Sequence, residues 1–160
     1  MSLINQQFWA ETMPLLGLIG TGTRPFLHGQ TTSDFLNASK MKLVHSCWLN
    51  ASGNVRALLE TRLTEEGAEI LVLAGELEDV LKGFDQAIFP ADQVRIIAMK
   101  KIRRIQYFSI NQLTRFDNVE WLPLEEAPPE CFVDCKVLSS TNYEKWRVGH
   151  GLPLASDELG

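Results

Sequence analysis

Hydrophobic and polar positions alternate with a period of two in the middle of the chain. Segments 42–49 and 55–63 flank a polar turn at 50–54, and in the second segment mostly apolar positions alternate with mostly charged ones. This alternation is typical of a strand with one buried face. A further turn at 64–67 leads into 69–74, which is apolar on both faces and is therefore expected at the centre of a sheet. The pattern predicts an antiparallel meander of three strands.

The period then changes to that of a helix. After Glu76, apolar residues recur at helical spacing, namely Leu77, Val80, Leu81, Phe84 and Ile88. Charged residues occupy the opposite side, so one face of this helix is expected to cover the sheet. Pro90 ends the helix, and segments 94–98 and 102–109 return to a strand pattern.

The N-terminal segment predicts two helices separated by a strand. A short helix is expected over 3–12, ahead of Pro14, and a brief buried strand over 15–20. The hydroxyl groups and the glycine of 21–23 predict a turn into a second helix over 24–36.

The hydrophobic pattern weakens after residue 110. Short strands are expected near 119–122 and 131–138, and a last helix over about 141–148. We therefore predict an α+β protein, with an antiparallel sheet and flanking helices. Its first domain is expected over 1–108, and a shortened or incomplete second unit over 109–160.

Composition and charge narrow the classes of function. A chain of 160 residues that is 45% hydrophobic can bury a core. Its net charge of −5 does not indicate the basic surface that binding of nucleic acid requires. The basic cluster Lys100, Lys101, Arg103 and Arg104 is expected to be a solvated strand edge. No segment has the roughly 20 apolar residues of a membrane span. Because no signal peptide is evident, the cytoplasm is the expected compartment.

The sequence predicts neither a metal centre nor a catalytic residue. Its three cysteines favour reduced thiols, with Cys47 buried in a strand, and Cys131 and Cys135 offer two metal ligands where structural zinc takes four. No phosphate-binding glycine loop or nucleophile elbow is present. His28 and His150 are expected at the surface. These observations give no support for covalent catalysis.

Residues 24–36 carry more polar groups than a core helix needs. Phe26 and Leu27 are expected to anchor this segment, while four polar residues are candidates for binding a ligand: Gln30, Thr31, Thr32 and Asp34. A purely structural interpretation stays open, in which Thr32 or Ser33 caps a helix and Gln30 is solvated.

Three motifs resemble those of the folate-binding YgfZ family. They are Phe-Leu-x-Gly-Gln-Thr-Thr-x-Asp at 26–34, Ser-Gly-Asn-Val at 52–55, and Trp-Arg-Val-Gly-His-Gly-Leu-Pro at 146–153. That family is similar in turn to the T-protein of the glycine cleavage system, an aminomethyltransferase that uses tetrahydrofolate. The resemblance implies an aminomethyltransferase-type, folate-binding-like domain with tetrahydrofolate or another folate as its ligand. It also implies a role in iron–sulfur cluster assembly or repair or in tRNA modification, with an iron–sulfur protein or assembly factor as partner.

The chain departs from the family at polar positions. The alignment implied by the resemblance places Ala57 at the catalytic carboxylate, Ala74 at an expected asparagine and Gly149 at a pterin-contacting glutamate. The chain also ends before the family's later signature, as expected of a fragment or a shortened relative. We therefore expect a non-catalytic folate-binding-type protein. Two alternatives are an aminomethyltransferase in which Glu60 or Asp34 supplies the acid, and an interaction domain that has lost the ligand.

Overall fold

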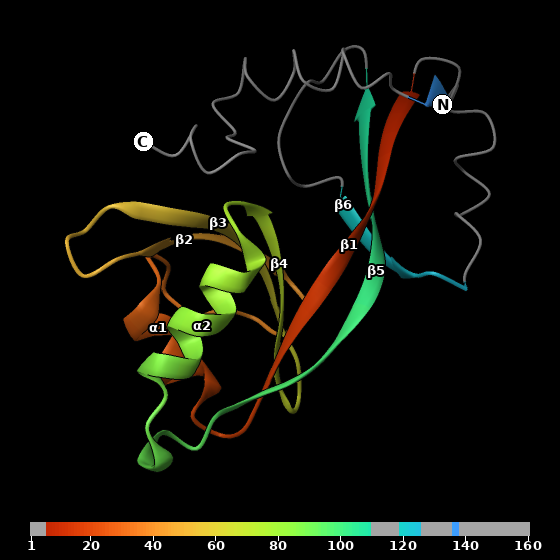
Figure 1. Cartoon of the computed structure of the whole chain (residues 1–160). Coiled ribbons are helices and arrows are strands. Elements are labelled where there is room, and N and C mark those ends of the chain that lie inside the picture. Colours follow the sequence, from red (N-terminus) through yellow and green to blue (C-terminus); the bar gives the residue numbers. More distant parts are fainter. Residues whose placement is uncertain (1–5, 110–118, 126–135, 138–160) are drawn as a thin grey trace. The chain divides into compact units, whose positions relative to one another are not determined.

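The computed structural model describes residues 6–109, 119–125 and 136–137 (Figure 1). In chain order, the elements are β1 (Gln6–Ile19), α1 (Thr23–Gln30), β2 (Leu43–Leu49), β3 (Val55–Leu63), β4 (Gly67–Ala74), α2 (Leu77–Ala87), the 3-10 turn η2 (Pro90–Asp92), β5 (Arg95–Ser109), β6 (Val119–Pro123) and β7 (Lys136–Val137). The predicted helix over 141–148, the pair Cys131 and Cys135, and the motif at 146–153 lie outside the described residues.

The chain forms two compact units. One consists of Leu15–Lys100 with Pro153–Gly160, and the other of Met1–Pro14 with Lys101–Leu152. Strands β1 and β5 each contribute to both units. The division into 1–108 and 109–160 that the sequence suggests stays a prediction, because most of its second part lies outside the described residues.

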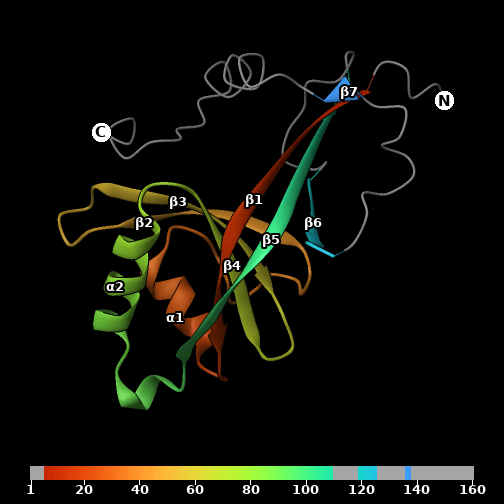
Figure 2. The ribbon, with the colours of Figure 1, turned by 45° about the vertical axis from the view of Figure 1, so that its right-hand side comes forward.

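The unit built on Leu15–Lys100 contains the predicted meander. Its strands follow the order β2-β3-β4-β1-β5. Strands β2, β3 and β4 pair antiparallel, with Ser46 opposite Leu59 and Leu59 opposite Val72. Helices α1 and α2 lie side by side on the same side of this sheet (Figures 1 and 2). The three strands and the helix predicted after Glu76, α2, are thus confirmed, and β4 is central.

The core of this unit lies between the sheet and the two helices. Phe84 of α2 is fully buried, and its ring makes edge-to-face contacts with Phe26 of α1 and Trp48 of β2, with centroid distances of 5.4 and 6.0 Å. Leu27 is also fully buried. The apolar stripe of α2 therefore packs against both the neighbouring helix and the sheet.

The first predicted helix is wrong where the structure describes it. Residues 6–12 belong to the long strand β1, which pairs with β4 through Leu16 and Ile70 and with β7 through Gln7 and Lys136. From Trp9 to Pro14, partly buried and exposed residues alternate. That period of two is the strand signal, and it prevailed over the helix-forming composition of the segment.

The second predicted helix ends earlier than expected, at Gln30 rather than at residue 36. The following residues turn toward the edge strand β2, where Thr31 forms a β-bridge with Trp48 and the Thr32 amide donates to the Cys47 carbonyl at 3.1 Å. Pairing with an open sheet edge replaces the next turn of the helix.

Two further expectations fail in the C-terminal strands. Residues 95–109 form one strand, β5, rather than two. In the unit that contains Lys101–Leu152, β5 pairs with β6 and lies between β1 and β6, so it is not an edge. Arg104 is only 4% exposed, and its guanidinium donates to Gln106 at 3.3 Å. The basic cluster is therefore not a uniformly solvated edge.

Cys47 is partly exposed rather than buried, and its thiol is free. In the described part of the chain, no helix combines the length and the apolar character needed to cross a membrane.

Candidate functional site

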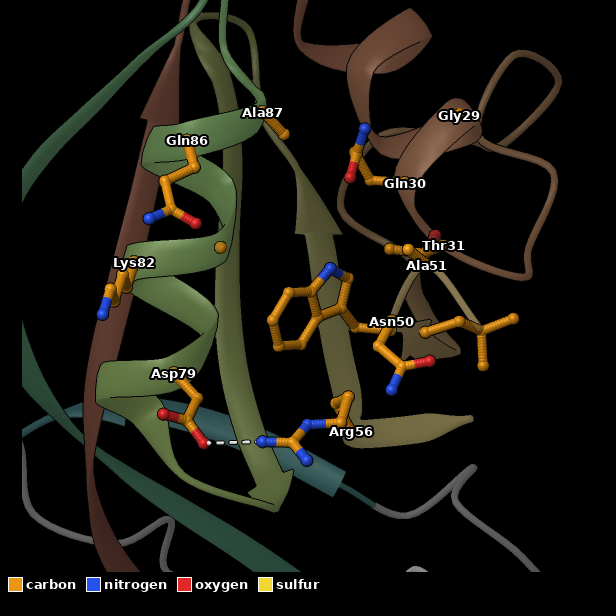
Figure 3. Close-up of a pocket in the computed structure, with 13 residues that line it drawn as sticks. Gly29, Gln30, Thr31, Asn50, Ala51, Arg56, Asp79, Lys82, Gln86 and Ala87 are labelled. Atoms are coloured by element: carbon orange, nitrogen blue, oxygen red, sulfur yellow. Dashed lines mark hydrogen bonds and ion pairs between the residues drawn. The ribbon is translucent and has the colours of Figure 1, made fainter. Parts of the chain in front are cut away.

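A cavity of about 680 Å³ lies between the end of α1, the end of β2 and one side of α2 (Figure 3). Its lining residues all belong to the unit built on Leu15–Lys100: Gly29, Gln30, Thr31, Trp48, Leu49, Asn50, Ala51, Arg56, Asp79, Lys82, Gly83, Gln86 and Ala87. We call it the Trp48 cavity.

One wall of the Trp48 cavity depends on a glycine in α2. A Cβ atom added at Gly83 would lie 2.1 Å from Cζ2 of Trp48, far inside van der Waals contact. The indole of Trp48 therefore packs directly against the backbone of α2, and its ring is perpendicular to that of Phe84. Because Trp48 is only partly buried and lines the cavity, it offers an aromatic surface to a ligand.

Several polar groups of the cavity make no hydrogen bond to the part of the chain that the structure describes. Figure 3 shows Lys82 and Gln86 on α2 and Gln30 across from this helix. In residues 6–109, no hydrogen bond engages these three side chains. Asn50 and Thr31 differ, since the side-chain oxygen Oδ1 of Asn50 accepts from the backbone of the turn and the Thr31 hydroxyl donates to the Leu27 carbonyl. Two amides and an ammonium group are therefore available to a ligand.

An ion pair closes one end of the cavity. Arg56 at the start of β3 donates to Asp79 of α2 at 3.3 Å, and both side chains are about half exposed (Figure 3). Asp79 is the one carboxylate among the described residues that line the cavity. Because the pair is solvated, its energy is small and either partner can exchange it for a ligand group.

The four residues predicted to bind a ligand separate into two groups. Gln30 and Thr31 line the Trp48 cavity, whereas Thr32 and Asp34 do not. The Thr32 hydroxyl accepts from the Cys47 amide at 2.9 Å, and the neighbouring Ser33 hydroxyl donates to the His45 carbonyl at 2.6 Å. These contacts close the exposed edge of β2, which is a structural role. A ligand-binding role for all four residues stays a prediction.

Asp34 organises the loop that follows. Its carboxylate accepts from the Asn37 side chain at 2.7 Å and from the amides of Leu36 and Asn37, and it lies 3.4 Å from His28. The hydrogen bonds from Asn37 are the main cause that lowers the pKa of Asp34. The stabilisation linked to this shift is present above the usual carboxyl pKa and is lost as the pH falls through the lowered one.

We expect Asn37→Ala to raise the pKa of Asp34 toward its ordinary value of 3.8. A titration of the Asp34 carboxyl carbon by NMR measures this shift, and Ser39→Ala, in the same exposed loop, is the matched control. An unchanged pKa in the Asn37 variant would show that the side-chain amide does not hold the carboxylate.

The acids considered for catalysis lie away from the cavity. Ala57 and Ala74 are buried in the core, so the position expected for the family's carboxylate does not face the Trp48 cavity. Glu60 is fully buried and pairs with His45 at 2.8 Å. Within the described residues, no group of three or more potential metal ligands occurs.

Comparison with known proteins identifies a fold. No family model matches the sequence, and no curated protein matches it. Among solved structures, the chain is similar to the glycine cleavage system aminomethyltransferase T from Bartonella henselae, with a TM-score of 0.53 and 15% sequence identity over 64% of this chain. The fold is therefore similar to part of that aminomethyltransferase. The match spans only 29% of that protein's length.

The aminomethyltransferase T-like fold confirms the coarse part of the resemblance seen in the sequence, while membership of the YgfZ family stays a prediction. Sequence reasoning missed Trp48, Gly83 and Gln86 as site residues. One signal was present, because Asp79, Lys82, Gly83 and Gln86 share one face of α2 and include a glycine in the helix interior. A glycine at such a position often marks a close approach.

Proposed function

We propose that this chain binds a folate-type ligand, which carries planar rings and a carboxylate tail, and that it does so without catalysis. The observation that carries the proposal is the Trp48 cavity, which is lined by an indole, by two amides that make no hydrogen bond within residues 6–109, and by the cation Arg56. The aminomethyltransferase T-like fold supports it.

The chemistry of the cavity fits such a ligand. A planar ring stacks favourably on an indole, and the amides of Gln30 and Gln86 can both donate to and accept from heteroatoms of a ring. Arg56 matches a carboxylate in charge and geometry, and Lys82 adds a second cation. A reduced folate supplies a carrier for one-carbon units when it is bound.

We base the proposed lack of catalysis on the two acids considered for it in the sequence, Glu60 and Asp34. Transfer of a one-carbon group is helped by an acid or base within hydrogen-bonding reach of the reacting atoms. Of the acids considered, Glu60 is buried beside His45 and Asp34 is held by Asn37, and neither lines the cavity.

The cellular role that we propose is that of a YgfZ-like protein, in maintenance of iron–sulfur proteins or in tRNA modification, with an iron–sulfur protein or assembly factor as partner. The motifs at 26–34 and 52–55 support this assignment. The cytoplasm is the proposed compartment.

Calorimetric titration of the full chain with 5-formyltetrahydrofolate tests ligand binding. We expect Arg56→Gln to weaken binding and Asp79→Asn to strengthen it, each by roughly three- to tenfold, because the first removes a cation and the second releases it. Both variants break the same ion pair, so an effect of stability alone would have the same sign in both. No heat of binding from a folded sample would refute the proposal.

A further inference from the structure

A second cavity, of about 280 Å³, adjoins the Trp48 cavity. Its lining residues are Gly22, Pro25, Phe26, Gly29, Gln30, Ala87, Phe89 and Asp92. We call it the Phe89 cavity. The two cavities share Gly29, Gln30 and Ala87, which lie at the C-terminal ends of α1 and α2. A ligand long enough to pass these residues would therefore contact both.

The Phe89 cavity has an apolar rim and one acidic group. Phe89 is 67% exposed, which makes it the most exposed large hydrophobic residue described. One carboxylate oxygen of Asp92 accepts from the Phe89 amide at 2.7 Å, and the other has no partner within residues 6–109. The cavity thus combines an uncovered aromatic ring with a hydrogen-bond acceptor.

The two cavities differ in charge. The charged residue of the Phe89 cavity is Asp92, whereas the Trp48 cavity contains Arg56 and Lys82 together with Asp79. A ring that carries N–H donors matches the acceptor Asp92, and a carboxylate matches Arg56. A ligand with both groups therefore has one orientation in which the charges are complementary.

Gly29 lies where the two cavities adjoin. A Cβ atom added there would meet nothing within 4 Å, and the residue lines both cavities. A side chain at this position would therefore add bulk at a residue that both cavities share, and its Cβ would not clash with the protein.

We propose that the Phe89 cavity binds the N–H-bearing head ring of the ligand, and that the ligand passes Gly29 and directs its carboxylate tail to Arg56. The inference rests on the proposed function and adds its orientation. Phe89 covers the head ring, and the Asp92 carboxylate accepts its N–H groups. A second ring, next to the tail, packs on Trp48.

Titration with fragments tests the orientation. The probes are 6-methyltetrahydropterin for the head and p-aminobenzoylglutamate for the tail. We expect Asp92→Asn to weaken binding of the head fragment about tenfold and to leave the affinity for the tail fragment unchanged. Arg56→Gln should weaken binding of the tail fragment and leave the affinity for the head fragment unchanged. Asp85→Asn, at an exposed carboxylate outside both cavities, is the matched control.

A block at Gly29 tests whether one ligand spans both cavities. We expect Gly29→Leu to weaken binding of 5-formyltetrahydrofolate at least about tenfold, since the added side chain competes with a ligand that passes the residue shared by the two cavities. Gly29→Ala controls for the change in helix propensity and should bind within about threefold of the wild type.

The outcomes separate the two proposals. If 5-formyltetrahydrofolate binds but neither Asp92→Asn nor Gly29→Leu weakens it, the orientation is overturned and the proposed function stands. If Asp92→Asn weakens the tail fragment instead of the head fragment, the orientation is overturned as well. If 5-formyltetrahydrofolate fails to bind the folded wild-type chain, both proposals fall.

Discussion

Replacing Phe84 with alanine is expected to lower the free energy of unfolding by about 3–5 kcal/mol, the usual range for a buried phenylalanine. Phe84 is fully buried, and its ring contacts Phe26 and Trp48 edge to face. The substitution therefore removes the side chain that joins α2 to both α1 and the sheet, and it leaves a cavity. Unfolding in urea measures the loss.

Phe89→Ala is the matched control, because Phe89 follows the same helix but is 67% exposed. Its unfolding free energy should stay within about 0.5 kcal/mol of the wild type. Equal losses in the two variants would show that Phe84 does not have the central packing role that its contacts indicate.

The elements that the sequence predicted best are those in which burial follows the hydrophobic period. In β3, Ala57, Leu59 and Leu63 face the core, as the period of two requires. In α2, Val80 and Phe84 are buried at helical spacing. The local hydrophobic pattern and the tertiary packing agree at these positions, so the pattern alone was sufficient to predict the strand and the helix.

The N-terminal segments show where a local pattern fails. Helix-forming residues over 3–12 favoured a helix, but pairing of Gln7 with Lys136 and of Phe8 with Val137 stabilises a strand. The end of α1 was likewise decided by the edge of β2, where Thr31 and Thr32 bond to Trp48 and Cys47. Such partners are distant in sequence, and propensity alone does not reveal them.

The candidate site was predictable only in part. Gln30 and Thr31 belong to a recognisable motif and do line the Trp48 cavity. Thr32 and Asp34 share that motif, yet their hydrogen bonds go to β2 and to the Asn37 loop. On α2, a polar face has the same sequence pattern whether it meets bulk solvent or a cavity, so Gln86 carried no separate signal.

The second large effect is expected at Gly83, where alanine should destabilise the fold and impair the Trp48 cavity. The added Cβ atom would lie 2.1 Å from the Trp48 ring, so the indole or the helix must move. Crowding of this kind costs about 1–3 kcal/mol, against a gain of at most about 1 kcal/mol from helix propensity. The displaced indole should also weaken binding of 5-formyltetrahydrofolate about tenfold.

Gly29→Ala separates the cost of crowding Trp48 from the gain in helix propensity. Gly29 is also helical and lines the same cavity, yet its Cβ would meet nothing within 4 Å. The propensity gain is common to both variants, so the difference between their unfolding free energies, about 1–3 kcal/mol, reports mainly the clash with Trp48. Near-UV circular dichroism should change only in the Gly83 variant, since its Trp48–Phe84 contact is disturbed. If the two variants are equally stable and bind equally well, the indole does not pack on α2, and the wall of the cavity on which the proposed ligand stacks is absent.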